Sequence, residues 1–314
     1  MQSGCFLHKK CYNVIIHLIV GGRQMYTESF GKRFWRMVYP LGLYILISSL
    51  AGFASSLYLV AQGVSELGFS ALNDPEQLLN QAVEKMPDTL FWATLISAAV
   101  TLPFLLLFYH WDMKREQKLG TKKIYEKVPA PYFGIVILLG IAACFAGNNL
   151  ITMSGLMNST SGYVEVAEVL YGGRLAVELL GIGILVPVVE ELIFRGLAYK
   201  RMREYASPLM AGITTSMLFA VFHGNLVQGV YAFLLGALLC YVYEKYHSFW
   251  APVLLHAAAN VISVLASETS VFDFLYSGRG IFFAFTLIVC VLVVVFVYLT
   301  ERLVVSNQLN QKAE

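Results

Sequence analysis

Residues 185–197 read LVPVVEELIFRGL. The ionisable residues of this stretch are Glu190, Glu191 and Arg195, and apolar side chains flank them on both sides. The apolar sequence extends over residues 174–196, close to the ~20 residues that a helix needs to cross the hydrocarbon core of a bilayer. A charge at the centre of such a helix costs about 2.5–3.5 kcal/mol on insertion scales, so these residues generally face the protein interior and carry function. The stretch therefore predicts a membrane-spanning helix with a functional polar face.

Seven further apolar runs accompany this one, at residues 37–61, 90–111, 133–155, 207–223, 226–243, 249–266 and 280–300. The whole chain is 58% hydrophobic and 13% charged, whereas a soluble domain is roughly 45–50% apolar and about 25% charged. This composition excludes a soluble globular enzyme, a disordered chain, a basic nucleic-acid binder and a disulfide-stapled secreted module. We predict an all-α, polytopic transmembrane helical bundle of about eight spans, with the lipid bilayer as its surroundings.

Lys and Arg are distributed unevenly among the loops. If the N-terminus is cytoplasmic, 18 of the 22 Lys and Arg residues fall in the inside segments. The positive-inside rule then predicts a multi-pass cell-membrane protein with both termini in the cytoplasm. The residues before Met25 lack the cleavage site of a signal peptide, and the basic sequence after it indicates a translation start at Met25.

The predicted spans divide the chain into four parts. These are a cytoplasmic N-terminal segment at 1–36, the first three spans within 37–173, a core of four spans at 174–266, and the last span with a cytoplasmic tail at 267–314. Residues 62–89 are expected to form an external loop. In this loop the Asp-Pro-Glu sequence from Asp74 signals a helix start and predicts a short amphipathic helix on the outer surface.

The core segment carries two glutamates in different situations. Glu191 and Arg195 are four residues apart on one helical face, so they can neutralise each other. Glu190 is rotated from Glu191 by about 100° in a helix of 3.6 residues per turn and has no partner in its own helix. An unpartnered carboxylate in an apolar site is suited to act as a general base. Pro187 predicts a bend here, and irregular backbone at membrane depth is tolerated where it lines a cavity.

Two further polar pairs follow on later spans. Phe219 and His223 are four residues apart and share one helical face, as do His256 and Asn260. Three alanines lie between the second pair and leave room for a close helix or a substrate. Together with the glutamates, these residues predict one polar site shared by three spans.

Two chemistries fit such a site. In the first, Glu190 and His223 polarise a water while His256 and Asn260 donate hydrogen bonds to the oxyanion of a tetrahedral intermediate, without a metal or other cofactor. In the second, Glu190, His223 and His256 bind zinc and leave a position open for water. HExxH and GxSxG are absent from the chain, so neither the usual zincin helix nor the nucleophile elbow is present.

The three motifs, Glu-Glu-x-x-x-Arg from Glu190, Phe-x-x-x-His from Phe219 and His-x-x-x-Asn from His256, resemble in their order those of the CPBP family. This family comprises type II CAAX prenyl endopeptidases and bacterial bacteriocin-processing or self-immunity proteins, also called the Abi family. The resemblance covers about 174–266. It implies an intramembrane endopeptidase that cuts a CAAX-like, bacteriocin-like or other membrane-anchored peptide. Members are often named metalloproteases, although a metal-independent glutamate mechanism is favoured.

The resemblance also implies a role for each motif residue. Glu190 would be the catalytic base, and His223 would help to activate the water. His256 and Asn260 would form the oxyanion site, while the remaining motif residues would support it; these are Glu191, Arg195 and Phe219.

One distance conflicts with a shared site. If a span begins at Ser207, His223 lies 16 residues further on, or about 24 Å at 1.5 Å per residue, toward the outer face. Residues 197–210 are therefore expected to continue as a cytoplasmic helix. The turn at Gly224 would then be buried in the bundle, and a water-filled cavity would open to the cytoplasm.

Polar residues outside the site are expected to have structural roles. Glu178 is predicted at the membrane interface, and Asn148 and Asn149 are predicted to form interhelical hydrogen bonds or to lie at the interface. The alternatives to a protease are a non-proteolytic scaffold or self-immunity protein and a proton-coupled transporter. The sequence does not fix the oligomeric state.

Overall fold

The computed structural model describes residues 28–119, 128–156 and 175–305. Within these ranges all regular secondary structure is helical, which confirms the all-α prediction. Six of the described helices are long and apolar enough to cross a membrane, which supports a polytopic bundle. The predicted start at Met25 and the tail at 306–314 lie outside the described residues.

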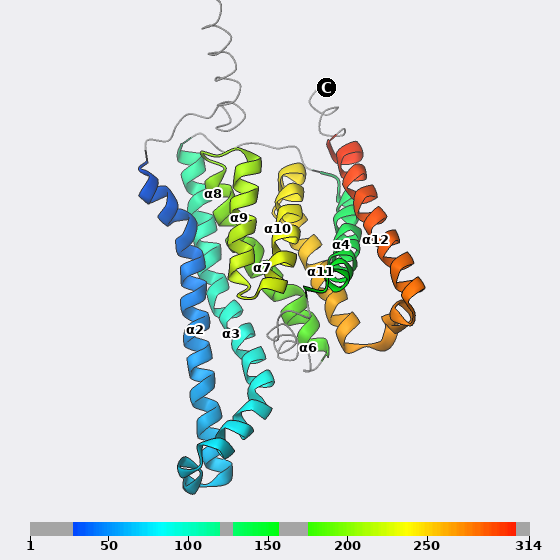
Figure 1. The fold of residues 1–314 in the computed structure, drawn as a ribbon. Coiled ribbons are helices and arrows are strands. Elements are labelled where there is room, and N and C mark those ends of the chain that lie inside the picture. The colour runs from blue at the N-terminus through cyan, green and yellow to red at the C-terminus, as the bar shows by residue number, and fades with distance from the viewer. Residues whose placement is uncertain (1–27, 120–127, 157–174, 306–314) are drawn as a thin grey trace, which may run out of the picture.

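The first two long helices form an antiparallel hairpin that reaches beyond the other helices (Figure 1). These are α2 (Phe30–Leu67) and α3 (Pro75–Lys118), joined by the short helix η1 (Phe69–Asn73). The separate surface helix predicted within residues 62–89 is wrong, because α3 continues without a break from this loop into the membrane span. Its start was predicted correctly, since the Asp74 side chain caps it by accepting a hydrogen bond from the backbone N–H of Gln77 at 3.2 Å.

The remaining long helices follow in the order of their sequence. They are α4 (Phe133–Ser154) after η2 (Ala130–Tyr132), α10 (Leu226–Tyr246), α11 (Trp250–Glu268) and α12 (Arg279–Leu299), with η6 (Ser270–Tyr276) before α12 and η7 (Thr300–Val305) after it. α4 and α11 pack with their backbones in close approach. A Cβ atom at Gly140 would lie 2.2 Å from the Leu255 carbonyl oxygen, so only glycine fits there.

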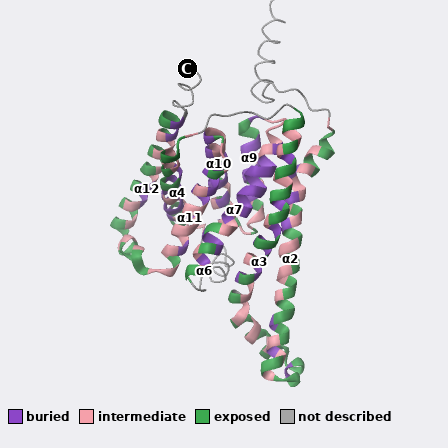
Figure 2. Ribbon diagram, turned by 180° about the vertical axis from the view of Figure 1, so that it is seen from behind, coloured by how far each residue is buried: buried purple, intermediate pink, exposed green. Residues whose placement is uncertain are grey.

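A continuous helical segment from Leu175 to Met202 carries both glutamates, and we call it the glutamate helix. It consists of α6 (Leu175–Leu180), the π-helical η4 (Gly181–Leu185), α7 (Val186–Glu191), the π-helical η5 (Leu192–Tyr199) and α8 (Lys200–Met202). Every residue from 189 to 199 is buried, so this part of the segment is surrounded by other helices, as Figure 2 shows around α7. π-Helical turns within helices occur frequently at functional sites.

The glutamate helix ends well before the next span. Residues 203–207 form a turn, and α9 (Pro208–Phe222) begins with Ser207 as its cap and Pro208 in its first turn. The predicted continuous helix over 197–210 is therefore wrong, because proline cannot continue a helix and serine favours a helix start. α9 has 15 residues and is about 22 Å long at 1.5 Å per residue, short of the ~30 Å hydrocarbon core.

The predicted conflict over depth does not arise, because His223 after α9 lines the same cavity as Glu190. The last turn of α9 stops part of the way across the bundle, so His223 need not lie at the far face. Gly224, with φ +74°, turns the chain into α10. The predicted burial of this turn is wrong at Gly224, which is exposed.

One end of the bundle carries most of the described basic residues, and we call it the basic end. It holds the start of α2 and the ends of α3, α8, α10 and η7, where Arg36, Arg115, Lys200, Arg201, Lys245 and Arg302 lie. The opposite end, where α2 ends and α12 begins, is the distal end.

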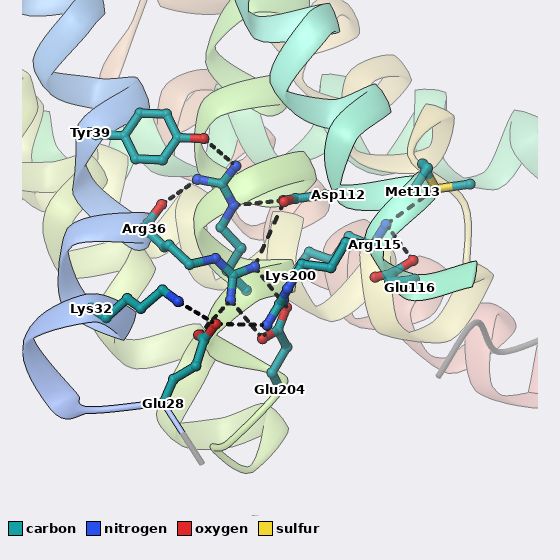
Figure 3. A network of polar contacts seen from close by, with 11 residues as sticks. Glu28, Lys32, Arg36, Tyr39, Asp112, Met113, Arg115, Glu116, Lys200 and Glu204 are labelled. Carbon is teal, nitrogen blue, oxygen red and sulfur yellow. Dashed lines mark hydrogen bonds and ion pairs between the residues drawn. The ribbon is translucent and has the colours of Figure 1, made fainter. Parts of the chain in front are cut away.

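A network of ion pairs at the basic end joins the hairpin to the glutamate helix (Figure 3). Arg201 binds Asp112 of α3 through Nε, at 2.6 Å from Oδ2, and donates from its Nη atoms to the Tyr39 hydroxyl, at 2.9 Å, and to the Arg36 carbonyl. Glu204 accepts from Arg36 at 3.0 Å and from Arg115 at 2.8 Å.

Glu28 extends this network beyond the start of α2. Its carboxylate accepts from Arg36 at 3.1 Å and from Arg115 at 3.2 Å. We call the whole set the clamp, comprising Glu28, Arg36, Asp112, Arg115, Arg201 and Glu204. The clamp fixes the position of α2 and α3 relative to the end of the glutamate helix.

Candidate active site

Glu191 and Arg195 form the ion pair that their spacing predicts. Both side chains are wholly buried, and Arg195 Nη1 lies 2.9 Å from Glu191 Oε1. Arg195 also donates from Nη2 to the Gly236 carbonyl at 3.0 Å, and its guanidinium stands 4.7 Å from the centre of the Phe219 ring. A Cβ at Gly236 would lie 3.2 Å from Nη2, so glycine leaves room for the arginine.

The same carboxylate oxygen of Glu191 also binds His256. The distance from His256 Nδ1 to Glu191 Oε1 is 2.8 Å. An ionised carboxylate only accepts hydrogen bonds, so Nδ1 carries the proton. This contact directs the other ring nitrogen, Nε2, toward Glu190.

Glu190 faces the cavity rather than a partner in its own helix. Its Oε2 atom lies 3.7 Å from His256 Nε2, which is too long for a direct hydrogen bond. The residue is 7% exposed. The two neighbouring glutamates therefore have different roles. Glu191 orients the His256 imidazole through Nδ1, and Glu190 faces its Nε2 atom.

His223 ends α9 and is oriented by its own backbone. Its Nδ1 lies 2.7 Å from the Phe219 carbonyl. A carbonyl accepts only, so Nδ1 donates, and a neutral ring offers Nε2 as an acceptor. The Phe219 ring meets His223 edge to face at 4.6 Å and His256 at 5.8 Å, and thereby packs against both imidazoles.

Asn260 supplies a hydrogen bond that the glutamate helix lacks. Its Nδ2 donates to the Ile182 carbonyl in η4 at 3.0 Å. In a π-helical register that carbonyl would accept from the N–H five residues later, but residue 187 is proline and has none. One amide hydrogen of Asn260 is thus engaged, and the other remains for a ligand.

All four predicted catalytic residues line one cavity of about 880 Å³. They are Glu190, His223, His256 and Asn260. The hairpin supplies another wall, with Tyr44 and Ser48 from α2 and Thr94 and Ser97 from α3. No charged residue or motif spacing in the hairpin sequence signalled this contribution.

The cavity extends toward the distal end. Its lining includes Asn148 and Ile151, which belong to the last two turns of α4. The expected opening of the cavity toward the cytoplasm stays a prediction.

The residues of the zinc alternative are not arranged as a ligand set. Within the described ranges, no group of three or more His, Cys, Asp or Glu side chains is placed to hold a metal ion. Both imidazoles engage Nδ1 elsewhere, His256 with Glu191 and His223 with the Phe219 carbonyl, which leaves Nε2 of each ring as the nitrogen that binds a ligand. The zinc alternative with Glu190, His223 and His256 therefore stays a prediction.

Other polar residues of the core depart from expectation in part. Glu178, which was predicted at the membrane interface, has a wholly buried side chain. Asn149 forms the predicted interhelical bond, donating to Thr286 of α12 at 3.0 Å. Asn148 instead bonds within α4, to the Cys144 carbonyl at 3.0 Å.

Comparison with known proteins agrees with the motifs. Residues 172–262 match the Rce1-like family, described as type II CAAX prenyl endopeptidase Rce1-like. The protein named "Putative membrane peptidase YdiL" of Bacillus subtilis (strain 168) is 25% identical over 151 residues, which are 45% of this chain and 61% of that relative. The chain thus spans less than two thirds of that relative's length. No solved structure matches this chain.

These matches confirm the resemblance to CPBP-type proteases that the three motifs indicate. They support a multi-pass membrane protease in general. The matched residues include the glutamate helix, α9, α10 and the half of α11 that bears His256 and Asn260.

Proposed function

We propose that this protein is an intramembrane endopeptidase that hydrolyses a peptide bond of a CAAX-like, bacteriocin-like or other membrane-anchored peptide. The observation that carries the proposal is the buried Glu190 carboxylate, which faces the Nε2 atom of an imidazole that Glu191 holds in place. Two carboxylates with separate roles, one reacting and one orienting, are typical of acid–base catalysis.

The first step is attack by water. Glu190 accepts a proton from the water while the water oxygen forms a bond to the carbonyl carbon of the substrate. The carbonyl π electrons move to its oxygen, and a tetrahedral oxyanion results. His223 Nε2 accepts a hydrogen bond from the same water and orients it.

The second step is collapse of this intermediate. The oxyanion re-forms the carbonyl, the carbon–nitrogen bond breaks, and the proton held by Glu190 moves to the leaving nitrogen. The products are a carboxylic acid and an amine, and Glu190 returns to its starting state. No metal or cofactor enters this scheme.

The oxyanion requires hydrogen-bond donors. His256 donates from Nε2 only when the ring is protonated on both nitrogens, and its Nδ1 is held by the Glu191 carboxylate. Asn260 donates with the amide hydrogen that Ile182 does not use. Arg195 holds Glu191 in place through the ion pair of 2.9 Å.

The charge distribution supports an orientation in the membrane. Arg36, Arg115, Lys200 and Arg201 gather at the basic end. By the positive-inside rule we assign this end to the cytoplasm. The cavity, which extends toward the distal end, then reaches into the outer half of the bilayer.

The test uses the full-length protein in proteoliposomes. The probes are an internally quenched, farnesylated peptide with a CAAX tail and the same peptide without the lipid. Glu190→Gln is expected to reduce cleavage by about 10²–10⁴-fold, the usual contribution of a general base. Glu76→Gln, an exposed residue at the start of α3, is the matched control and should cleave normally.

Each alternative gives a different result. Cleavage that is lost with 1,10-phenanthroline and restored by zinc would support the metal alternative, whereas the glutamate mechanism predicts no effect of the chelator. A scaffold would cleave neither peptide and would retain its cellular phenotype with Glu190→Gln. A transporter would show pH-coupled flux that this substitution abolishes.

A further inference from the structure

Tyr44 places a phenol at the candidate active site from outside the region that matches the Rce1-like family. It lies on α2, whereas the match covers residues 172–262. Its side chain lines the same cavity as Glu190, His223 and His256. Tyr44 is 4% exposed, so it is part of the wall and not a surface residue.

The packing around Tyr44 fixes its ring. It belongs to the same buried cluster as Val189 of α7 and Phe194 of η5. Its ring centre lies 5.6 Å from that of Phe222, one residue before His223. The ring is thus held between the helix that bears Glu190 and the helix that ends at His223.

The phenol is close to Glu190 but not bound to it. Both groups line the same cavity, and no hydrogen bond joins them in the described part of the chain. The Tyr44 hydroxyl can therefore donate to a substrate bound at Glu190 without first breaking a hydrogen bond to the Glu190 carboxylate.

The proposed chemistry has a single donor that works in every protonation state, the second amide hydrogen of Asn260. His256 Nε2 donates only as an imidazolium, and Asn260 has one amide hydrogen engaged with Ile182. A tyrosine hydroxyl remains protonated at neutral pH and donates without any proton transfer. Preorganised donors of this kind stabilise an oxyanion strongly because they need no reorganisation during the reaction.

We infer that Tyr44 is a catalytic residue whose hydroxyl donates a hydrogen bond to the oxyanion of the tetrahedral intermediate. This inference rests on the proposed function. The bond forms as the carbonyl oxygen gains charge and is released when the carbonyl re-forms, and the phenol keeps its proton throughout.

The clamp explains how a residue of the hairpin can be placed accurately. Arg201 binds the Arg36 carbonyl and the Tyr39 hydroxyl of α2. Tyr44 follows Arg36 by eight residues, about 12 Å along α2, and Glu190 precedes Arg201 by eleven residues, about 16 Å along the glutamate helix. The clamp therefore sets the register between these two helices.

The experiment measures kcat and KM for the quenched farnesylated CAAX peptide in proteoliposomes. Tyr44→Phe keeps the ring and removes the donor, so kcat should fall by about 10²–10³-fold, as for other oxyanion donors, with KM unchanged. The pH profile of kcat/KM should keep its shape, because the phenol does not titrate near neutral pH. Tyr58→Phe, on an exposed part of the same helix, is the matched control and should keep full activity.

The outcomes separate this inference from the proposed function. If Glu190→Gln is inactive and Tyr44→Phe cleaves like the native protein, the role of Tyr44 is overturned and the proposed function stands. A shifted acidic limb in Tyr44→Phe would likewise overturn donation to the oxyanion, because it would show that Tyr44 tunes Glu190. If the native protein cleaves neither peptide, or Glu190→Gln retains activity, both fall.

A second variant covers the case in which Tyr44→Phe does not fold. Incorporation of 3-fluorotyrosine at position 44 keeps the shape of the ring and makes the hydroxyl a stronger donor. A changed kcat with the native KM would support the role of Tyr44, and an unchanged kcat would overturn it.

Discussion

Arg195 and Arg201 lie six residues apart on the glutamate helix and are both buried, at 0% and 3% exposed, yet their surroundings differ. All three nitrogens of Arg201 donate hydrogen bonds, to Asp112, to the Arg36 carbonyl and to the Tyr39 hydroxyl. Arg195 Nε and Glu191 Oε2 have no hydrogen-bond partner among the described residues. The guanidinium of Arg201 in the clamp is thus fully hydrogen-bonded, whereas buried polar atoms of the candidate active site have no hydrogen-bond partner among the described residues.

The two clusters also differ in charge balance. The clamp combines three carboxylates with three guanidinium groups. The candidate active site has two carboxylates, Glu190 and Glu191, but only one guanidinium group, that of Arg195. The imidazole of His256 lies between the two carboxylates. The clamp is therefore suited to holding helices together, and the site is suited to moving a proton. Four substitutions or conditions test this difference.

The largest expected effect is that of Arg195→Met. Removal of this arginine leaves the wholly buried Glu191 without its guanidinium, and breaking such a pair costs about 3–5 kcal/mol. The free energy of unfolding in detergent micelles, measured by denaturant titration, should fall by this amount. The double variant Glu191→Gln with Arg195→Met should recover part of the loss. A loss smaller than that of Arg201→Met would contradict the comparison.

Arg201→Met should have an intermediate effect. Asp112 loses its closest partner but retains Arg36, whose Nη2 lies 3.7 Å from Asp112 Oδ1. Loss of hydrogen bonds to a charged group generally costs about 1.5–3 kcal/mol, and the same unfolding measurement applies. Loss of Arg201 would also weaken the attachment of α2 to the glutamate helix, so kcat for the CAAX peptide should fall. Arg302→Met, which lies outside the clamp, should keep the native kcat. Native activity in Arg201→Met would show that the clamp does not position Tyr44.

Arg115→Gln is expected to have a small, salt-dependent effect. Its side chain is 27% exposed, and exposed ion pairs contribute about 0–1 kcal/mol. The difference in unfolding free energy from the native protein should shrink as NaCl is raised, because salt screens accessible charges. An effect that is independent of salt would place Arg115 with the buried pairs instead.

The smallest expected effect is a loss of stability at acidic pH. Burial alone raises the pKa of the Glu28 carboxyl, but Arg115 and Arg36 outweigh burial and hold this pKa below its ordinary value of 4.5. Because the folded pKa is lowered, the stabilisation is present above pH 4.5 and is lost as the pH falls through the folded value. Unfolding measured across this range should show the loss in the native protein and not in Glu28→Gln. An identical acid response in both proteins would exclude a role for Glu28.

The sequence predicted the parts of this molecule that depend on composition and local spacing. Each of the eight apolar runs is helical over all but at most two of its described residues, and the spacing of Glu191 and Arg195 predicted their ion pair. The order of the three motifs predicted that Glu190, His223 and His256 would share one cavity. These features follow from a hydrophobic run of known length or from a separation of four residues.

The remaining features depend on contacts between helices that are distant in sequence. The bond between Glu191 and His256 joins residues 65 positions apart, and no local pattern encodes it. Tyr44 resembles any other aromatic residue of a membrane span until the packing of α2 is known. The break before α9, in contrast, could have been predicted from the sequence. Ser207 followed by Pro208 is a recognisable helix start, and the expected helix over 197–210 did not take it into account.

The hairpin offers a practical use that follows from its length. α2 has 38 residues and so measures about 57 Å, nearly twice the ~30 Å thickness of the hydrocarbon core. An antibody fragment or a fused domain attached at Phe69–Asn73 would sit directly after the end of the helix that bears Tyr44. Such a fiducial would rise above the detergent belt in electron cryomicroscopy, and its tilt would report on movements of the wall of the cavity.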